Sequence, residues 1–235
     1  MIVVLAHAGD HPARALVEAW RVSGAVLVTP ADLVVDGWVV PFQGPGGTFV
    51  AEGRRRETGA VTAAMVRLGA VDPVELPTLV EADRSYAASE ITALLAYWLR
   101  ALRGPVVNRP SPDCLAGPGW SIEEWLTRAA RAGVPTGTWA RHPGETPPPP
   151  PEVDWVTVVG GEVFGTLPAP AVAGALATLA AAGGVGVLGA GFVAGGDAAG
   201  TAGEGRAHLA RVTLCPALDG EDERRALAAL LARPR

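Results

Sequence analysis

The chain of 235 residues contains no lysine, so all 19 of its basic residues are arginine. This excludes a Schiff base, a P-loop lysine and a lysine clamp on phosphate, because each of these needs a primary amine. Amide side chains are almost as scarce, with Asn108 and Gln43 the single asparagine and glutamine. Coding bias toward Ala, Gly, Val, Pro and Arg accounts for this composition without reference to function.

Cysteine and long apolar runs are also scarce. Cys114 and Cys215 form no C-x-x-C pair, so a reducing cytoplasm is the expected location. The uncharged stretch 165–196 is divided by prolines and glycines, which favours a helix followed by a buried strand over a membrane span. The N-terminus lacks the positive region of a signal peptide. A net charge of −5 gives no reason to expect a nucleic acid partner.

Apolar runs separated by turn residues indicate an α/β fold. Residues 2–6 and 25–29 are predicted strands on either side of a helix capped by Asp10, and this β-α-β start is typical of a parallel sheet. A hairpin is expected around QGPGG, with strands at 38–42 and 48–51. We therefore expect the first part of the chain to form a parallel-type sheet.

The rest of the chain alternates between helix and strand signals. Five consecutive prolines favour an extended polyproline II segment, which acts as a spacer. The predicted elements on either side of it are a strand at 61–68, a helix from Asp83 to about Arg103 with Leu94 on its buried face, a strand at 105–108, a helix from Ser121 to Gly133, a hairpin around Gly160-Gly161, a helix at 170–182, strands at 185–193 and 207–215, and a helix at 221–232.

Two stretches resemble the two ends of an ATP-grasp ligase. Residues 86–135, which contain VVNRP at 106–110, resemble the junction between that family's N-terminal domain and its nucleotide-binding half. Residues 156–231 resemble the end of the same enzymes. Between these parts an ATP-grasp enzyme carries its lid strands and phosphate loop, whereas this chain has ARHPGETPPPPPEVD.

The resemblance implies an α/β fold in which a pre-ATP-grasp (Rossmann-like) N-terminal domain precedes a reduced ATP-grasp α+β lobe without its lid. The implied boundaries are 1–118 for the pre-ATP-grasp-like domain, 119–140 for a connecting helix and strand, 141–153 for a proline-rich linker, and 154–235 for the remnant C-terminal lobe.

The residues that the family uses for ATP chemistry are replaced. That chemistry needs cations on the phosphates and carboxylates that carry magnesium. The resemblance places Gly191 where one acid belongs, and Thr213 and Cys215 at the other oxygen-ligand positions. Hydroxyl and thiol groups are poor ligands for a hard cation. We therefore expect lost ligase activity and no cofactor. The alternative is an active carboxylate–amine ligase that binds ATP and Mg in a minimal site or in one completed by a partner.

A separate H-x-x-D-H pattern directly follows the first predicted strand. His7, Asp10 and His11 are suitable ligands for zinc or iron, and ligands bind beyond the carboxyl ends of strands in open α/β sheets. The alternative is that Asp10 caps the helix while both histidines lie on a solvated loop. We favour this structural interpretation and keep the three residues as metal candidates.

Arginine and tryptophan residues supply the substrate and partner candidates. Arg67 and Arg109 lie at predicted strand ends, and the resembling enzymes use arginines of this domain near their substrate; Asn108-Arg109 can equally be a structural turn. Trp120 and Trp139 lie near the joint between the lobes, where aromatic residues suit a docked peptide, although core burial is the commoner role. The run at 54–56 is interpreted as a solvated face.

Relatives with this type of N-terminal domain include enzymes that modify or ligate peptides. We therefore expect a binding or accessory subunit in peptide or natural-product modification, with a protein or peptide as partner. The partner can also be a second copy, giving a homo-dimer. Neither nucleic acid nor membrane binding is expected.

Overall fold

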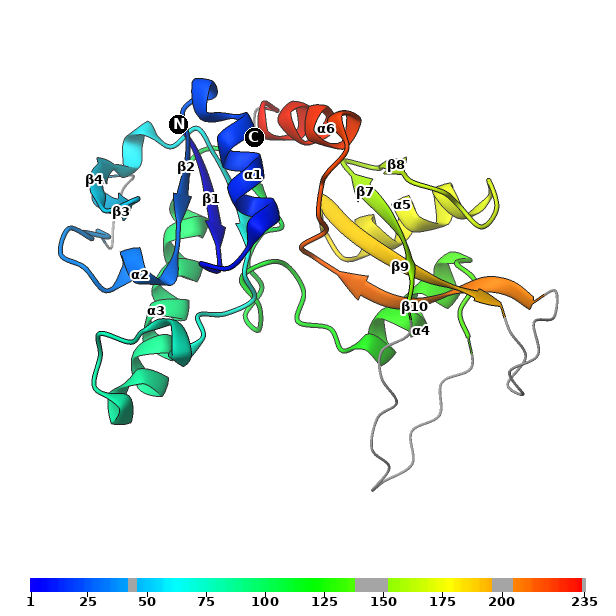
Figure 1. The fold of residues 1–235 in the computed structure, drawn as a ribbon, viewed down its shortest axis with the longest axis horizontal. Coiled ribbons are helices and arrows are strands. Elements are labelled where there is room, and N and C mark those ends of the chain that lie inside the picture. The colour runs from blue at the N-terminus through cyan, green and yellow to red at the C-terminus, as the bar shows by residue number, and fades with distance from the viewer. Residues whose placement is uncertain (42–45, 138–151, 196–204, 234–235) are drawn as a thin grey trace. The chain divides into compact units, whose positions relative to one another are not determined.

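The computed structural model describes residues 1–41, 46–137, 152–195 and 205–233 (Figure 1). The chain divides into unit 1, which comprises Met1–Gly119 and Ala217–Arg235, and unit 2, which comprises Trp120–Pro216. The last helix thus belongs to unit 1, whereas the sequence-based boundaries group it with 154–235. Trp139 and nearly all of the proline-rich linker lie outside the described residues.

Unit 1 is built on a parallel four-stranded sheet in the order β2-β1-β5-β6. Its strands are β1 (Ile2–Ala6), β2 (Ala25–Val28), β5 (Ala63–Arg67) and β6 (Val106–Val107). The first strand, IVVLA, has an apolar residue at every position and is buried from Val3 onward, as expected for a parallel sheet covered on both faces. The predicted β-α-β start is confirmed, because α1 (His11–Ala19) connects β1 to its parallel neighbour β2.

The helices of unit 1 are α1, the short α2 (Pro30–Leu33), α3 (Glu81–Ala101) and α6 (Glu221–Leu231), with 3-10 turns η1 (Arg21–Ser23), η2 (Thr58–Ala60) and η3 (Pro73–Glu75). Two details of the predicted long helix are wrong. Asp83 lies inside the first turn rather than at the cap, which is Val80. Leu94 is 39% exposed, because the buried face is turned toward Leu95, Trp98 and Leu99.

The hairpin predicted around QGPGG is confirmed in part, and residues 42–45 of its turn region lie outside the described residues. A single bridge joins Val39 to Thr48, and the two-stranded ladder forms downstream between β3 (Thr48–Ala51) and β4 (Arg54–Glu57). Glu52 and Gly53 have φ angles of 52° and 68°, the left-handed pair that a tight two-residue hairpin turn requires. The arginine run is therefore a strand, and Arg54 and Arg55 are exposed on it.

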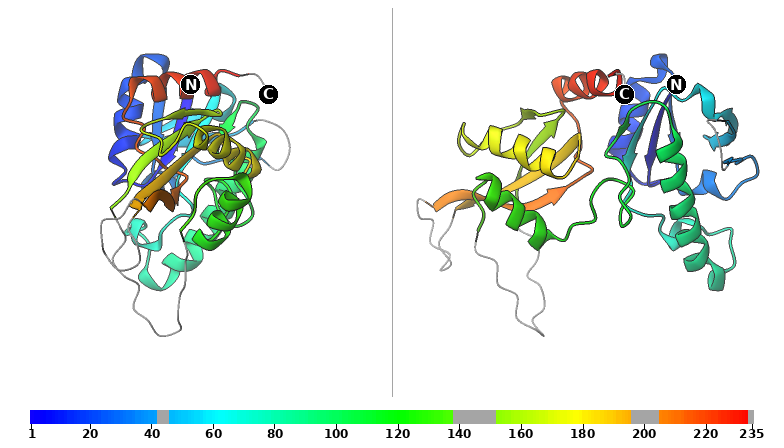
Figure 2. Two further views of the ribbon diagram at one scale, coloured as in Figure 1. Left: turned by 90° about the vertical axis from the view of Figure 1, so that its right-hand side faces the viewer. Right: turned by 180° about the vertical axis from the view of Figure 1, so that it is seen from behind.

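Unit 2 is an antiparallel sheet in the order β10-β9-β7-β8, with α4 and α5 on one face (Figures 1 and 2). The strands are β7 (Asp154–Val159), β8 (Glu162–Phe164), β9 (Val187–Gly195) and β10 (Gly205–Thr213), and the helices are α4 (Ile122–Ala132) and α5 (Val172–Ala182). The predicted cap at Ser121 is confirmed, since its side chain accepts a hydrogen bond from the Glu124 amide at 3.3 Å. The predicted β7–β8 hairpin is confirmed as well.

One core cluster joins the helices of unit 2 to its sheet. It contains Trp125 and Ala129 of α4, Leu176 and Leu179 of α5, and the alternate strand residues Val156, Val158, Leu188, Ala190, Phe192 and Leu209. Because side chains alternate along a strand, the residues between these face away from the helices.

Within the described ranges of the whole chain, no helix is long and apolar enough to cross a membrane.

Candidate functional site

Polar side chains gather at the carboxyl ends of three strands of the parallel sheet, β1, β5 and β6. His7 follows β1, Arg67 ends β5 and Asn108 follows β6. Arg67 and Asn108 are only 4% and 2% exposed, whereas Arg109 is exposed. Asn108 has a φ of 56°, a left-handed conformation that asparagine tolerates better than most residues. Ligands of open α/β sheets bind at this edge, so these residues form the first candidate site.

Arg67 forms a buried two-point ion pair with Asp10. Its Nε and Nη2 lie 2.8 and 3.1 Å from the two carboxylate oxygens, and the two side chains are 3% and 12% exposed. The same carboxylate caps α1 by accepting a hydrogen bond from the Ala13 amide at 2.9 Å. The expected capping role of Asp10 is therefore confirmed. Arg67 holds the start of α1 against the end of β5, and its contact with a substrate remains a prediction.

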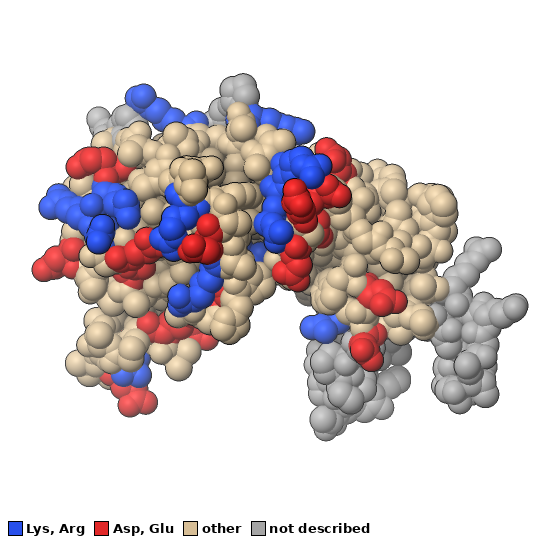
Figure 3. Space-filling view, turned by 45° about the horizontal axis from the view of Figure 1, so that its top comes forward, with Lys and Arg blue, Asp and Glu red and all other residues tan. Residues whose placement is uncertain are grey.

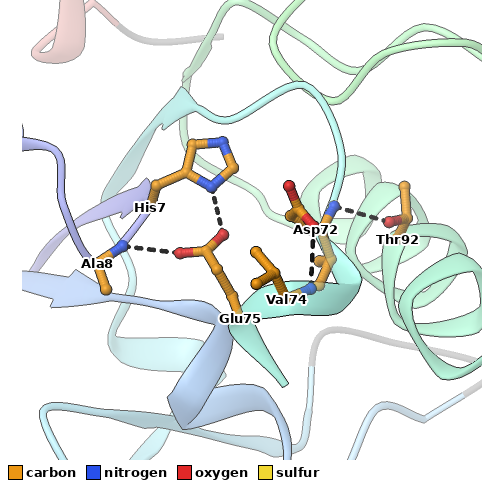
Figure 4. A network of polar contacts seen from close by, with 7 residues as sticks. His7, Ala8, Asp72, Val74, Glu75 and Thr92 are labelled. Carbon is orange, nitrogen blue, oxygen red and sulfur yellow. Dashed lines mark hydrogen bonds and ion pairs between the residues drawn. The ribbon is translucent and has the colours of Figure 1, made fainter. Parts of the chain in front are cut away.

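His7 is held by Glu75, which lies 68 residues further along the chain (Figure 4). The Nδ1 atom of His7 contacts one carboxylate oxygen, and the Ala8 amide donates to the other at 3.0 Å. The contact fixes the imidazole ring through Nδ1. Glu75 gave no signal in the sequence, because only the fold brings η3 to the end of β1.

The loop that carries Glu75 is itself anchored. Asp72 accepts a hydrogen bond from the Val74 amide at 2.9 Å, and the Val71 amide donates to Thr92 of α3 at 3.0 Å (Figure 4). His7 and Asp10 thus have separate protein partners. In the described part of the chain, no group of three or more His, Cys, Asp or Glu residues is placed to hold a metal ion.

The second candidate site is the face of the unit 2 sheet opposite α4 and α5. The strand pairing places Trp155, Gly191 and Arg211 in one row across β7, β9 and β10, and places Thr157, Gly189 and Thr213 in the next row. We call these the Trp155 row and the Thr157 row. Both rows have glycine at the centre, on the strand where the resemblance expects an acid.

A side chain at Gly191 would require its neighbours to move. A Cβ atom there would lie 2.8 Å from Val153 Cγ2 and 3.2 Å from Arg211 Cβ. The Arg211 guanidinium instead lies over the Trp155 ring, 5.6 Å from its centroid. The ring is partly solvated, with Trp155 42% exposed. The glycine therefore lets an arginine and a tryptophan meet across the central strand.

In the Thr157 row, neighbouring side chains likewise occupy the space beside the central glycine. A Cβ atom on Gly189 would lie 2.6 Å from Thr213 Cγ2 and 3.1 Å from Pro216 Cβ. The Thr213 hydroxyl accepts a hydrogen bond from the Cys215 amide at 3.1 Å. Thr213 and Cys215 thus form a local turn, and neither supplies a carboxylate.

The tryptophans near the start of unit 2 pack internally. Trp120 and Trp125 form an edge-to-face pair with centroids 4.7 Å apart, and Trp125 is 4% exposed. The Arg128 guanidinium covers the Trp120 ring at 3.8 Å from its centroid. For Trp125 core burial is confirmed, while Trp120 is partly buried and its role toward a partner stays a prediction.

Charges of both signs are interspersed across the face of the molecule that Figure 3 shows. Arginine and acidic side chains lie next to each other there. Among the ion pairs of the described residues, Arg21 pairs with Glu18 at 2.8 Å. Hydrogen bonding to Glu18 raises the pKa of Arg21. Interspersed charges produce weaker long-range fields than a patch of one sign.

No protein-family model matches the chain, and no curated protein matches it. Solved structures do match along its whole length. Macrocyclase MdnB from Microcystis aeruginosa has 16% identity and a TM-score of 0.63, with 99% of each chain covered. A RiPP-associated ATP-grasp ligase from Chryseobacterium gregarium, in complex with ADP and a leader and core peptide, has 13% identity and a TM-score of 0.67, with 100% of this chain and 97% of the other covered.

A third structure, ATP-grasp ligase PsnB complexed with a minimal precursor, Mg and ADP, has 15% identity and a TM-score of 0.65, with 99% of this chain and 98% of the other covered. The chain has the fold of these ATP-grasp ligases. The predicted fold class is thus confirmed, and the likeness extends over both units.

Proposed function

We propose that this protein has the ATP-grasp fold without its ligase chemistry and acts as a binding or accessory subunit in peptide or natural-product modification. The proposed layout is a pre-ATP-grasp domain and a reduced C-terminal lobe whose lid is replaced by the proline-rich linker. The observation that carries the proposal is Gly191, where a Cβ atom would lie 2.8 Å from Val153. An acid needs at least that atom, so this position cannot hold magnesium without rearrangement.

Two further features support the loss of ATP chemistry. Transfer of a phosphoryl group needs fixed cations around the phosphates, and the family supplies them with lysines that this chain does not contain. The other acid positions carry Thr213 and Cys215, which bond to each other through the Cys215 amide. The missing cations and the missing metal ligands both support a loss of ATP chemistry.

Support for a peptide as partner comes from the structural neighbours. The ligase from Chryseobacterium gregarium is in complex with a leader and core peptide, and PsnB with a minimal precursor. Both proteins share the fold of this chain at 13% and 15% identity. We infer that a peptide-binding surface outlasted the catalytic groups, since binding needs neither lysine nor magnesium.

A second candidate function is an active carboxylate–amine ligase whose nucleotide site is completed by arginines or by a partner. The presence of Mg and ADP in PsnB supports this alternative. The two functions differ in whether Mg-ATP binds this chain alone. A ligand that binds the folded state at a hundredfold excess over its Kd stabilises it by about 2.7 kcal/mol.

Thermal unfolding with and without Mg-ATP distinguishes them. The proposal predicts no shift in Tm, with ATP plus EDTA as the control for effects of the nucleotide alone. A magnesium-dependent rise in Tm overturns the loss of ATP binding. Sedimentation velocity of the purified chain then tests the homo-dimer as one form of partner, which a clean monomer excludes.

A further inference from the structure

A cavity of about 430 Å³ lies in unit 1 at the amino ends of the parallel strands. Residues at or just before the starts of three strands line it: Ile2 of β1, Ala63 of β5, and Gly104 and Pro105 before β6. One helix completes its wall through Ala228 and Leu231 of α6. His7, Arg67 and Asn108 lie at the carboxyl ends of these parallel strands, which is the opposite end from the cavity. The cavity is therefore separate from the first candidate site.

The lining of this cavity combines positive charge with an apolar surface. Arg103 and Arg233 line it, and no acidic residue does, although the chain as a whole has a net charge of −5. Trp20 and Leu231 supply apolar surface, and Leu231 is 5% exposed. Ser23 and Thr62 add hydroxyl groups.

Neither guanidinium at the cavity has an ion-pair partner among the described residues. Other arginines of unit 1 do, such as Arg67 with Asp10 at 2.8 Å and Arg21 with Glu18 at 2.8 Å. Thr62, in contrast, is occupied, because its hydroxyl and the backbone of Met1 are joined by hydrogen bonds at 3.1 Å. The arginines are thus the polar groups of the lining that are best placed to take a ligand.

We propose that this cavity binds a small amphipathic anion, namely a carboxylate or phosphate group joined to a compact apolar body. Guanidinium groups recognise both kinds of anion through charge-assisted hydrogen bonds, so the two arginines would hold the head group. Trp20 and Leu231 would cover the apolar body, and a cavity of about 430 Å³ is within the usual range for small-molecule sites. Bound there, the ligand would contact both α6 and the starts of the strands.

Calorimetric titration of the full chain tests the site with defined probes. Hexyl phosphate and hexanoate carry the two head groups on the same body, and inorganic phosphate and hexanol carry the head group or the body alone. We expect at least one amphiphile to bind at least about ten times more tightly than inorganic phosphate or hexanol. Whichever of hexyl phosphate and hexanoate binds more tightly identifies the preferred head group. If neither hexyl phosphate nor hexanoate gives a binding signal, the proposal is overturned.

Three variants locate the binding. Arg103→Gln with Arg233→Gln removes both charges from exposed positions, so the fold should persist while affinity falls by a factor of about ten or more. Ala228→Trp should abolish binding by filling the cavity. Arg54→Gln, an exposed arginine on β4, is the matched control and should bind as the natural chain does. Unchanged affinity in the double variant, or in Ala228→Trp, contradicts the assignment. Circular dichroism melts confirm that each variant is folded.

Discussion

The two sheets treat ionisable residues in opposite ways. At the carboxyl edge of the parallel sheet, charged groups are retained and paired with each other, Arg67 with Asp10 and His7 with Glu75. On the face of the antiparallel sheet opposite α4 and α5, the Trp155 row and the Thr157 row together carry one charged side chain, Arg211, beside neutral residues such as Gly191 and Thr213. The ionisable groups at the first sheet thus pair with each other, whereas the one charged side chain in the two rows of the second sheet lies over an aromatic ring.

This difference separates structural charge from catalytic charge. A buried ion pair such as Arg67–Asp10 persists because loss of one partner leaves the other charge buried and uncompensated. A carboxylate that serves a bound metal has no such internal partner, so its loss costs little stability. An ATP-grasp fold that no longer binds nucleotide is therefore expected to change in its second sheet and to keep the charges of its first.

The largest effect is expected from removing Asp10. Asp10→Ala leaves Arg67, 3% exposed, without its partner and also removes the cap of α1, so the free energy of unfolding should fall by about 3–5 kcal/mol. Urea unfolding measures the change. Asp10→Asn keeps an oxygen for the Ala13 amide and should retain about 1 kcal/mol more stability. Equal and small losses in both variants would mean that the pair is only a surface contact.

An intermediate effect is expected from placing an acid at Gly191 in the second sheet. Gly191→Asp forces the new side chain against Val153 and Arg211, and overpacking of this kind costs about 1–3 kcal/mol. Gly191→Ala adds only the Cβ atom and separates crowding from charge. We expect neither variant to gain a magnesium-dependent rise in Tm with ATP. A stable Gly191→Asp variant that binds Mg-ATP would show that one residue separates this chain from an active site.

The elements with strong local signals were predicted from the sequence. The β-α-β start, the Ser121 cap and the Gly160-Gly161 hairpin follow from apolar runs and turn residues a few positions apart, and all three are confirmed. The hairpin around QGPGG is confirmed only as the Val39–Thr48 bridge, and the longer ladder forms around the Glu52-Gly53 turn a few residues later. Local patterns cannot decide between two neighbouring turns when the packing of the strand selects one.

The candidate sites were predictable only in part. The sequence names Asp10 as a cap and Arg67 as a strand-end residue, but their pairing depends on β1 and β5 being neighbours. Glu75 has no pattern of its own, since its role depends on a loop that folds back over the end of β1. The contact of Trp155 with Arg211 depends on strand register, which places Gly191 between them. Such long-range pairings follow from topology and not from spacing.

A smaller effect is expected at the His7–Glu75 contact. Glu75→Gln removes the negative charge that holds His7 and weakens the bond from the Ala8 amide, so stability should fall by about 1 kcal/mol. Hydrogen exchange of the Ala8 amide should become faster, because its acceptor is then held less firmly. Glu57→Gln, at an exposed position on β4, is the control and should change neither quantity. Unaltered exchange at Ala8 would show that the backbone alone fixes this loop.

The smallest effect is expected between Arg211 and Trp155, on the face of the second sheet opposite α4 and α5. The guanidinium lies 5.6 Å from the ring centroid, and Trp155 is 42% exposed, so solvent should limit the attraction to about 0.5 kcal/mol. A double-mutant cycle with Arg211→Gln and Trp155→Leu measures this coupling without the separate effects of each change. A coupling above about 1.5 kcal/mol would mean that the row is desolvated and stabilises the fold. In that case the second sheet, like the first, would hold its charge through an internal partner, and the contrast between the two sheets would fail.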